Sequence, residues 1–222
     1  MKKIGMLSIG QSPRDDILPP LKEILGEGFE ILEAGALDDL TPEDIEQIDF
    51  RPDDYLLVSR LRDGTEVMIT KRLILPLLQE RIHRLEEEGV RLTVIMCTGK
   101  FPKFESKGLV VTPQEILKGV LEATLKRGRL AVVYPAEEQT HMAESAFGRE
   151  GVEVYADHLS PYEGEGDVEA LADRLADRDP DLILLNCFGF SSNVKRAVAE
   201  KTSKPVILSN ALVARVLKEL AS

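Results

Sequence analysis

The chain of 222 residues contains no tryptophan, only two cysteines and only three histidines. Two cysteines are too few for the disulfide framework that holds many small secreted domains together, and a reducing compartment would keep both as thiols. So few histidines also argue against a zinc site, because structural and catalytic zinc need several His or Cys ligands. We therefore expect free thiols and no metal.

Long apolar runs and an excess of basic residues are missing as well. No stretch approaches the roughly 18 apolar residues that a membrane span requires, and the first residues lack the apolar stretch of a signal peptide. Lysine and arginine number 28 against 39 aspartates and glutamates, a formal net charge of −11, whereas nucleic-acid-binding proteins present a basic face. We expect a cytoplasmic protein that binds neither membranes nor nucleic acid.

One short pattern occurs twice in variant form. Residues 91–99 and 181–189 each open with a charged residue, continue through an apolar run, and close with a cysteine followed two places later by a glycine. Short apolar runs bounded by turn signals are typical of strands buried on both faces. Cys97 and Cys187 are therefore expected at the carboxyl ends of buried parallel strands, the edge where open α/β sheets bind ligands.

The segments around these runs alternate between strand and helix patterns, which indicates an α/β protein with mainly parallel sheets. Their order repeats, so we predict two similar Rossmann-like domains, residues 1–111 and 112–204, related by pseudo-symmetry and with an active-site cleft between them. Residues 205–222 have no counterpart in the core of the repeat and are expected to return to the first domain. A turn at Asp63 and Gly64 predicts a hairpin inserted in the first domain.

Two local predictions concern loops that flank the repeated strands. Ser12 is a candidate N-cap and Pro13 suits the first helical position, so a helix is predicted from there to Leu25. Residues 98–111 after the first cysteine are predicted to form a long loop. Gly5 and Gly10 lack the third glycine and the spacing of a dinucleotide-binding fingerprint, and no P-loop is present. We therefore expect no cofactor.

The matched placement of the only two thiols suggests proton transfer. Removing a proton from the carbon beside a carboxylate and returning it to the other face needs one acid/base group on each side. Cys97 and Cys187 could serve, because a suitable field converts a thiol to its reactive thiolate. The alternative is that both are small buried apolar side chains, which is a common role of free cysteine.

Polar residues near the predicted strand ends are candidates for binding the substrate carboxylate. Arg14 could clamp it, and main-chain amides near each cysteine could add donors. For several of these residues, helix capping is the competing interpretation. The candidate substrate-binding set is Ser8, Gln11, Ser12, Arg14, Thr98, Gly99, Gly189, Ser209 and Asn210.

Residues 9–14, 187–190 and 206–215 carry a resemblance to the AroM family, within the aspartate/glutamate/hydantoin racemase superfamily, that extends over essentially the full length. The resemblance implies two similar α/β domains with the site between them and, as in the racemases, cofactor-free two-base chemistry by paired cysteines. Thr98 directly follows Cys97 and Phe188 directly follows Cys187, where racemases commonly have Cys-Asn-Thr and Cys-Thr. The groups that would hold a substrate carboxylate are therefore missing or moved.

The leading hypothesis is a cofactor-independent racemase or isomerase for a small carboxylic acid, with Cys97 and Cys187 as the opposed acid/base pair. Three alternatives stay open. They are a lyase that needs only Cys187, a non-catalytic binding or sensor protein for a small acid, and a redox-active cysteine pair. A homo-oligomer is also compatible with the sequence.

Overall fold

The computed structural model describes residues 2–162 and 164–222, so Met1 and Glu163 lie outside the description. The chain packs as two compact units. The first comprises Met1–Pro113 together with Leu217–Ser222, and the second comprises Gln114–Val216. The boundaries between the units fall within two helices, α4 (Pro113–Thr124) and α8 (Ser209–Ala221).

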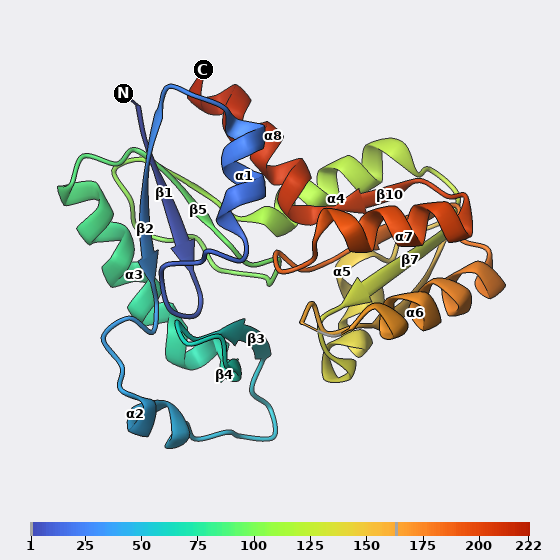
Figure 1. The fold of residues 1–222 in the computed structure, drawn as a ribbon, viewed down its shortest axis with the longest axis horizontal. Helices are drawn as coiled ribbons and strands as arrows, with labels where there is room; N and C mark the ends of the chain where they lie inside the picture. The colour runs from blue at the N-terminus through green and yellow to red at the C-terminus, as the bar shows by residue number, and fades with distance from the viewer. Residues whose placement is uncertain (1, 163) are drawn as a thin grey trace. The chain divides into compact units, whose positions relative to one another are not determined.

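The first unit is built on a four-stranded parallel sheet with the strand order β2-β1-β5-β6. Figure 1 shows β1, β2 and β5 side by side. The central strand is buried from its third residue to its end, as expected for a strand with a partner on either side. The four strands are β1 (Lys2–Ser8), β2 (Phe29–Gly35), β5 (Leu92–Ile95) and β6 (Leu109–Val111).

The second unit has its own parallel sheet, with the order β10-β9-β7-β8. Successive residues of its central strands pack into different apolar clusters: Ala131 and Ile183 join one, and Leu130 and Leu182 join the other. These strands are therefore buried on both faces, as predicted. The four strands are β7 (Gly128–Tyr134), β8 (Val152–His158), β9 (Leu182–Leu185) and β10 (Val206–Leu208).

The two sheets have the same topology. Counted along the chain within each sheet, the first strand is central, the second pairs with it on one side, the third pairs with it on the other, and a short fourth strand forms the far edge. Strands β5 and β9, which precede the two cysteines, therefore hold equivalent places. The predicted α/β fold with two similar, mainly parallel sheets is confirmed. The predicted cleft between the domains stays a prediction.

The last strand corrects one part of the domain prediction. β10 pairs with β9 in the second sheet, so the predicted return of residues 205–222 to the first domain is wrong for this strand, and only Leu217–Ser222 pack with the first unit. The counterpart of β10 is β6, in the segment predicted to be a loop. β6 is an apolar run of only three residues, Leu109–Val111, which is shorter than the run by which a buried strand is recognised.

The first helix begins later than predicted. α1 spans Leu18–Leu25, whereas Ser12 and Pro13 predicted a helix start at their own positions. Pro19 and Pro20 explain the difference, because proline lacks an N–H and fits best in the first turn of a helix, and a helix starting at Pro13 would hold two adjacent prolines in its interior. The helix therefore begins just before these two prolines, and the backbone from 9 to 14 is left to form a loop.

The first unit carries the predicted insertion between β2 and β5. It contains α2 (Pro42–Glu46) and the antiparallel hairpin of β3 (Leu56–Arg60) and β4 (Glu66–Thr70), which leads directly into α3 (Lys71–Glu87). The second unit adds the 3-10 helix η1 (Glu137–Met142) and the helices α5 (Ala143–Phe147), α6 (Glu165–Arg178) and α7 (Ser192–Thr202).

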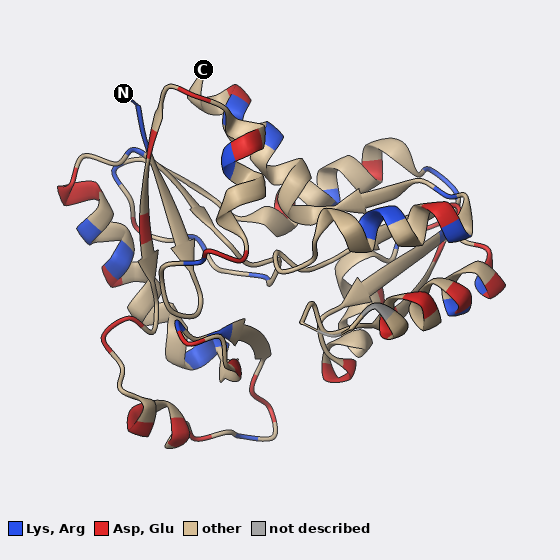
Figure 2. Ribbon diagram, in the orientation of Figure 1, with Lys and Arg blue, Asp and Glu red and all other residues tan. Residues whose placement is uncertain are grey.

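Most charged residues lie on helices and loops rather than on the central strands (Figure 2). Within the described part of the chain, every helix is too short or too polar to cross a membrane.

Candidate functional site

Cys97 is the first residue beyond the backbone pairing of β5 with β1. The Met96 amide donates to the Leu7 carbonyl of β1 (2.8 Å), which extends the pairing one residue past the end of β5. The amide of Gly99 then donates to the Cys97 sulfur, with an N···Sγ distance of 3.3 Å. Cys97 is 9% exposed and packs in an apolar cluster that also contains Ile95.

Cys187 occupies the same position in the second unit. The Asn186 amide donates to the Val133 carbonyl of the central strand β7 (2.8 Å), and the amide of Gly189 donates to the Cys187 sulfur at 3.4 Å. Cys187 is half-buried. Both thiols therefore follow the third strand of their sheet in chain order, as the repeated pattern of strand, cysteine and glycine predicts. Each also accepts a hydrogen bond from the amide two residues later.

The two glycines allow this contact. A Cβ atom on Gly99 would lie 3.0 Å from the Leu57 side chain and 3.4 Å from the Cys97 sulfur, and one on Gly189 would lie 2.9 Å from Pro161. A larger residue at either place would crowd the loop that turns back over the sulfur. An N–H group aimed at sulfur stabilises a thiolate more than a neutral thiol. The backbone thus favours the reactive form at both positions.

Ser209 and Asn210, both predicted to bind substrate, lie buried beneath the Cys187 loop. The amide nitrogen of Asn210 donates to the carbonyls of Phe188 and Phe190, at 2.8 Å each, and the Ser209 hydroxyl donates to the Leu185 carbonyl at 2.6 Å. The observed role of both side chains is to hold the backbone around Cys187. Substrate binding by them stays a prediction.

The loop after Cys97 is held by one face of α3. Lys71 donates from Nζ to the Lys100 carbonyl (3.1 Å), and the Gln79 side chain exchanges two hydrogen bonds with the backbone of Glu105 (2.8 and 2.9 Å). Glu86 binds the end of the loop. The three residues are eight and seven positions apart, about two helical turns each, so they share one face. Thr98, at the start of this loop, is half-buried.

The Glu86 carboxylate accepts hydrogen bonds from the Ser106 hydroxyl (2.6 Å), the Gly108 amide (3.1 Å) and the Lys107 amide. Burial opposes its ionisation, but these donors outweigh burial, so the pKa of Glu86 lies below its ordinary value. Glu86 is therefore an ionised anchor for the chain just before β6.

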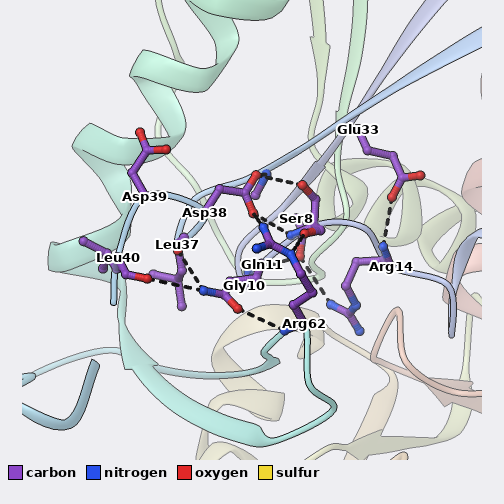
Figure 3. A network of polar contacts seen from close by, with 12 residues as sticks. Ser8, Gly10, Gln11, Arg14, Glu33, Leu37, Asp38, Asp39, Leu40 and Arg62 are labelled. Carbon is purple, nitrogen blue, oxygen red and sulfur yellow. Dashed lines mark hydrogen bonds and ion pairs between the residues drawn. The ribbon is translucent and has the colours of Figure 1, made fainter. Parts of the chain in front are cut away.

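The loop after β1 forms a polar network around Asp38 (Figure 3). The Asp38 carboxylate accepts from the amide and the hydroxyl of Ser12 (2.7 Å each), from the Gly35 amide (2.6 Å) and from Arg62 (3.3 Å). Arg62 lies on the β3–β4 turn. Ser12, predicted to bind substrate, therefore joins the β1 loop to the insertion.

Gln11 has a similar part in this network (Figure 3). Its amide nitrogen donates to the carbonyls of Leu37 (3.2 Å) and Leu40 (3.4 Å), and its oxygen accepts from the Arg62 amide at 3.0 Å. Ser8 is fully buried, and its hydroxyl oxygen accepts from the Gly10 amide at 3.1 Å. Direct substrate contacts of Gln11, Ser12 and Ser8 stay predictions.

Arg14, the predicted carboxylate clamp, is buried and forms a two-pronged ion pair with Asp16 (2.7 and 2.9 Å). Burial raises the pKa of Asp16, but the Arg14 guanidinium outweighs it, so this pKa lies below its ordinary value. A third contact runs from Arg14 to the Ser8 hydroxyl at 3.3 Å. Arg14 lines an open pocket of about 320 Å³ together with Arg60 and Arg62, and its charge is already matched by a carboxylate.

Two residues near Cys97 were not found from the sequence. Tyr55 and Lys71 flank the hairpin and reach the loop that follows Cys97. The sequence carries a weak signal for Lys71, since it begins the spacing of polar residues along α3 that bind this loop. Tyr55 has no local signal, because its position depends on how the hairpin packs. In the described ranges 2–162 and 164–222, no group of three or more His, Cys, Asp or Glu side chains is arranged to hold a metal ion.

Comparison with known proteins gives a family and a fold. The model of the family described as AroM protein matches residues 4–221. The chain has no match among curated proteins.

Among solved structures, the chain is similar to a glutamate racemase from Francisella tularensis in complex with D-glutamate, with a TM-score of 0.61 at 16% identity over 99% of this chain and 80% of that one. It is also similar to a Nocardia farcinica maleate cis-trans isomerase mutant with a covalently bound succinylcysteine intermediate. The TM-score is 0.62 at 15% identity, over 99% of this chain and 92% of that one. A third similar structure is an arylmalonate decarboxylase, with a TM-score of 0.58 at 16% identity over 99% of this chain and 91% of that one. These likenesses show that the chain shares the two-domain α/β fold of these proteins.

Proposed function

Since this chain belongs to the AroM protein family, with a fold shared by racemases and isomerases, we propose that it is a cofactor-independent isomerase or racemase for a small carboxylic acid. Cys97 and Cys187 are the proposed acid/base pair. The cytoplasmic location and a homo-oligomeric state stay predictions from the sequence.

One observation carries the proposal. Each sulfur accepts an amide hydrogen bond from the glycine two residues later, at 3.3 Å for Cys97 and 3.4 Å for Cys187, and each follows the equivalent strand of its unit. A single cysteine in such a loop could be a packing residue. Two cysteines with the same backbone contact, at the sheet edge where α/β proteins bind ligands, favour a shared chemical role.

In the proposed reaction, one thiolate removes the proton from the carbon beside the carboxylate. The C–H bond breaks, an S–H bond forms, and the electron pair moves into the carboxylate as an enediolate. The other thiol then donates its proton to the opposite face of the same carbon and becomes the thiolate. The reaction requires both thiols to reach one carbon, and it consumes no cofactor because protons and electrons balance within the pair and the substrate.

The names of similar structures support this class of substrate. One contains D-glutamate and another carries a succinylcysteine, so proteins of this fold act on small acids. Because their identity to this chain is below one fifth, the particular acid is left to experiment.

The test is deuterium exchange. The protein is incubated in deuterated water with a panel of small carboxylic acids that includes both enantiomers of aspartate and glutamate, maleate, and a substituted malonate, and products are followed by NMR. We expect at least one acid to isomerise or to gain deuterium beside its carboxylate. Cys97→Ala and Cys187→Ala should each lower the rate by about 10²–10⁴-fold, the range that general acid–base groups contribute. Undiminished turnover in both variants would refute the role of the thiols.

A second candidate is chemistry by one thiol, Cys187. Cys187 is half-buried whereas Cys97 is buried, so Cys187 is the more accessible nucleophile or proton donor. The maleate isomerase mutant holds a succinylcysteine intermediate, so one cysteine of that protein bonds to a small acid, and the arylmalonate decarboxylase is an enzyme of this fold that removes a carboxylate. A lyase of this kind would lose activity in Cys187→Ala and keep it in Cys97→Ala. Tight binding of an acid without turnover would instead favour a sensor protein.

A further inference from the structure

The hairpin insertion brings two side chains together at its open end. Tyr55 precedes β3 and Lys71 follows β4, and the Lys71 amide donates to the Tyr55 carbonyl at 2.9 Å. This bond continues the strand pairing, whose last register pair is Leu56 with Thr70. The Lys71 ammonium lies 4.4 Å from the centre of the Tyr55 ring, a favourable cation–π distance. The hairpin thus presents a hydroxyl and a cation as one unit.

Both side chains contact the loop that follows Cys97. The Lys71 ammonium donates to the Lys100 carbonyl at 3.1 Å, and the Lys100 amide approaches the Tyr55 hydroxyl oxygen at 3.5 Å. Burial raises the pKa of Tyr55, and the charge of the nearby Cys97 raises it further. Tyr55 packs against the apolar cluster that contains Cys97, and its hydroxyl keeps its proton at neutral pH, so it can donate a hydrogen bond.

Lys71 differs from several arginines of this unit in its charge environment. Arg14 pairs with Asp16, Arg62 with Asp38 and Arg72 with Asp54. In the part of the chain that is described, no carboxylate pairs with Lys71. Burial lowers the pKa of Lys71, and the like charge of Lys100 lowers it further. A partly buried ammonium with a like-charged neighbour and no carboxylate partner is stabilised by a bound anion.

We propose that Lys71 and Tyr55 bind the substrate carboxylate beside Cys97. This inference rests on the proposed action of the Cys97 site on a small carboxylic acid. An ammonium has three donors and a phenol has one, and Lys71 uses one donor on Lys100. The remaining donors can hold the two oxygens of a carboxylate while its neighbouring carbon faces the sulfur. In this proposal the cation that binds the carboxylate is Lys71 and not Arg14, which was predicted from the sequence.

The proposal can be tested without knowledge of the substrate, by alkylation of the native protein. Iodoacetate and iodoacetamide react with a thiolate in the same way: an S–C bond forms, a C–I bond breaks, and iodide leaves with its electron pair. Only iodoacetate carries a carboxylate beside the attacked carbon. The rate ratio of iodoacetate to iodoacetamide at Cys97, divided by the same ratio in the unfolded chain, reports carboxylate recognition independently of thiol reactivity. Peptide mass spectrometry separates Cys97 from Cys187.

We expect native Cys97 to favour iodoacetate by on the order of tenfold over the unfolded chain, which corresponds to about 1.4 kcal/mol of electrostatic preference. Lys71→Met should abolish the preference, Lys71→Arg should keep most of it, and Tyr55→Phe should lower it by about threefold, as for one hydrogen bond. Lys103→Met, a matched change at an exposed lysine of the same loop, should leave it unchanged.

Either of two results would overturn the proposal. One is a native Cys97 with no preference for iodoacetate, or with no reaction with it at all, because a carboxylate site at this sulfur must admit the reagent. The other is an equal loss of preference in Lys71→Met and Lys103→Met, which would indicate general surface charge. Since the assay does not depend on turnover, absence of deuterium exchange with a retained Lys71-dependent preference would reject only the proposed reaction.

Discussion

The two cysteine loops have the same contact at sulfur but are held in place by different means. The Cys97 loop is bound by side chains of the insertion and of α3, namely Tyr55, Lys71, Gln79 and Glu86. The Cys187 loop is bound by Ser209 and Asn210 at the start of α8. Equivalent sheet topology therefore fixes where the sulfurs lie, while the hairpin, α3 and α8 supply different side chains around them.

This difference extends to polarity. The Cys97 loop has the ammonium of Lys71 and the hydroxyl of Tyr55 against its backbone. The Cys187 loop is held by the neutral side chains of Ser209 and Asn210. The pair is thus symmetric in its thiols and asymmetric in its environment. In the proposed reaction, the Cys97 side recognises the charged group of the acid, and the Cys187 side contributes mainly its thiol.

Among substitutions that should affect one cysteine loop and not the other, Gly10→Ala has the largest expected effect. A Cβ atom here would lie 2.3 Å from the Ser59 hydroxyl and 2.4 Å from the Arg60 carbonyl of β3, so the hairpin must shift away from the β1 loop. We expect the unfolding free energy to fall by about 3 kcal/mol. Alkylation of Cys97 should accelerate, whereas that of Cys187 should not.

Gly119→Ala is the matched control for that change. Gly119 lies on the exposed side of α4 with open space around its Cα atom, so alanine should stabilise the protein by about 0.5–1 kcal/mol. If Gly10→Ala and Gly119→Ala lowered the unfolding free energy by similar amounts, the loss at Gly10 would not come from its contact with the hairpin.

Asn210→Ala should affect the other loop, the one that contains Cys187. This substitution leaves two buried carbonyls of the Cys187 loop without their donor, which should cost about 2 kcal/mol and accelerate alkylation of Cys187 but not of Cys97. The exposed Asn193, which bonds to Arg196 on α7, provides the control, and Asn193→Ala should change stability by less than about 0.5 kcal/mol. Equal acceleration at both cysteines would show that the two loops do not have separate supports.

A smaller and pH-dependent effect should distinguish the Cys97 loop. The pKa of Glu86 is lower in the folded protein than its ordinary value, so ionised Glu86 adds stability above the ordinary glutamate pKa of about 4.3. That stability is lost as the pH falls through the folded-state pKa. In denaturant unfolding across acidic pH, Glu86→Gln should show a shallower decline than the unmodified protein. Glu87→Gln changes the exposed neighbour, and its unfolding free energy should vary with pH as that of the unmodified protein does. Identical curves for all three proteins would contradict the anchoring role of Glu86.

The sequence predicts the places of the thiols because these depend on local pattern. An apolar run, a cysteine and a glycine are enough to place a buried strand and its terminal loop, and the Asp63-Gly64 turn is enough to place the hairpin. The surroundings of the thiols depend on contacts between distant segments. Nothing near Tyr55 in the chain indicates that its hydroxyl approaches the amide of Lys100, and nothing near Ser12 indicates that Asp38 binds it.

The same distinction explains the two errors of the fold prediction. β6 and β10 are short edge strands, recognised by the partner to which they hydrogen-bond rather than by their own composition. The helix start predicted at Ser12 followed a valid capping rule. It failed because two prolines seven and eight residues later restrict where the helix can begin, and because Asp38 takes up the Ser12 hydroxyl.

The central claim is that the two thiols act as an opposed pair, and its most direct test is the position of label at early conversion. An enantiomerically pure acid that the protein turns over is incubated in deuterated water, and the remaining substrate and the product are analysed separately. Two opposed thiols predict deuterium in the product and almost none in the recovered substrate, because each thiol exchanges protons on its own face. Equal labelling of both would mean that one group serves both faces, and the account of a cysteine pair would be wrong.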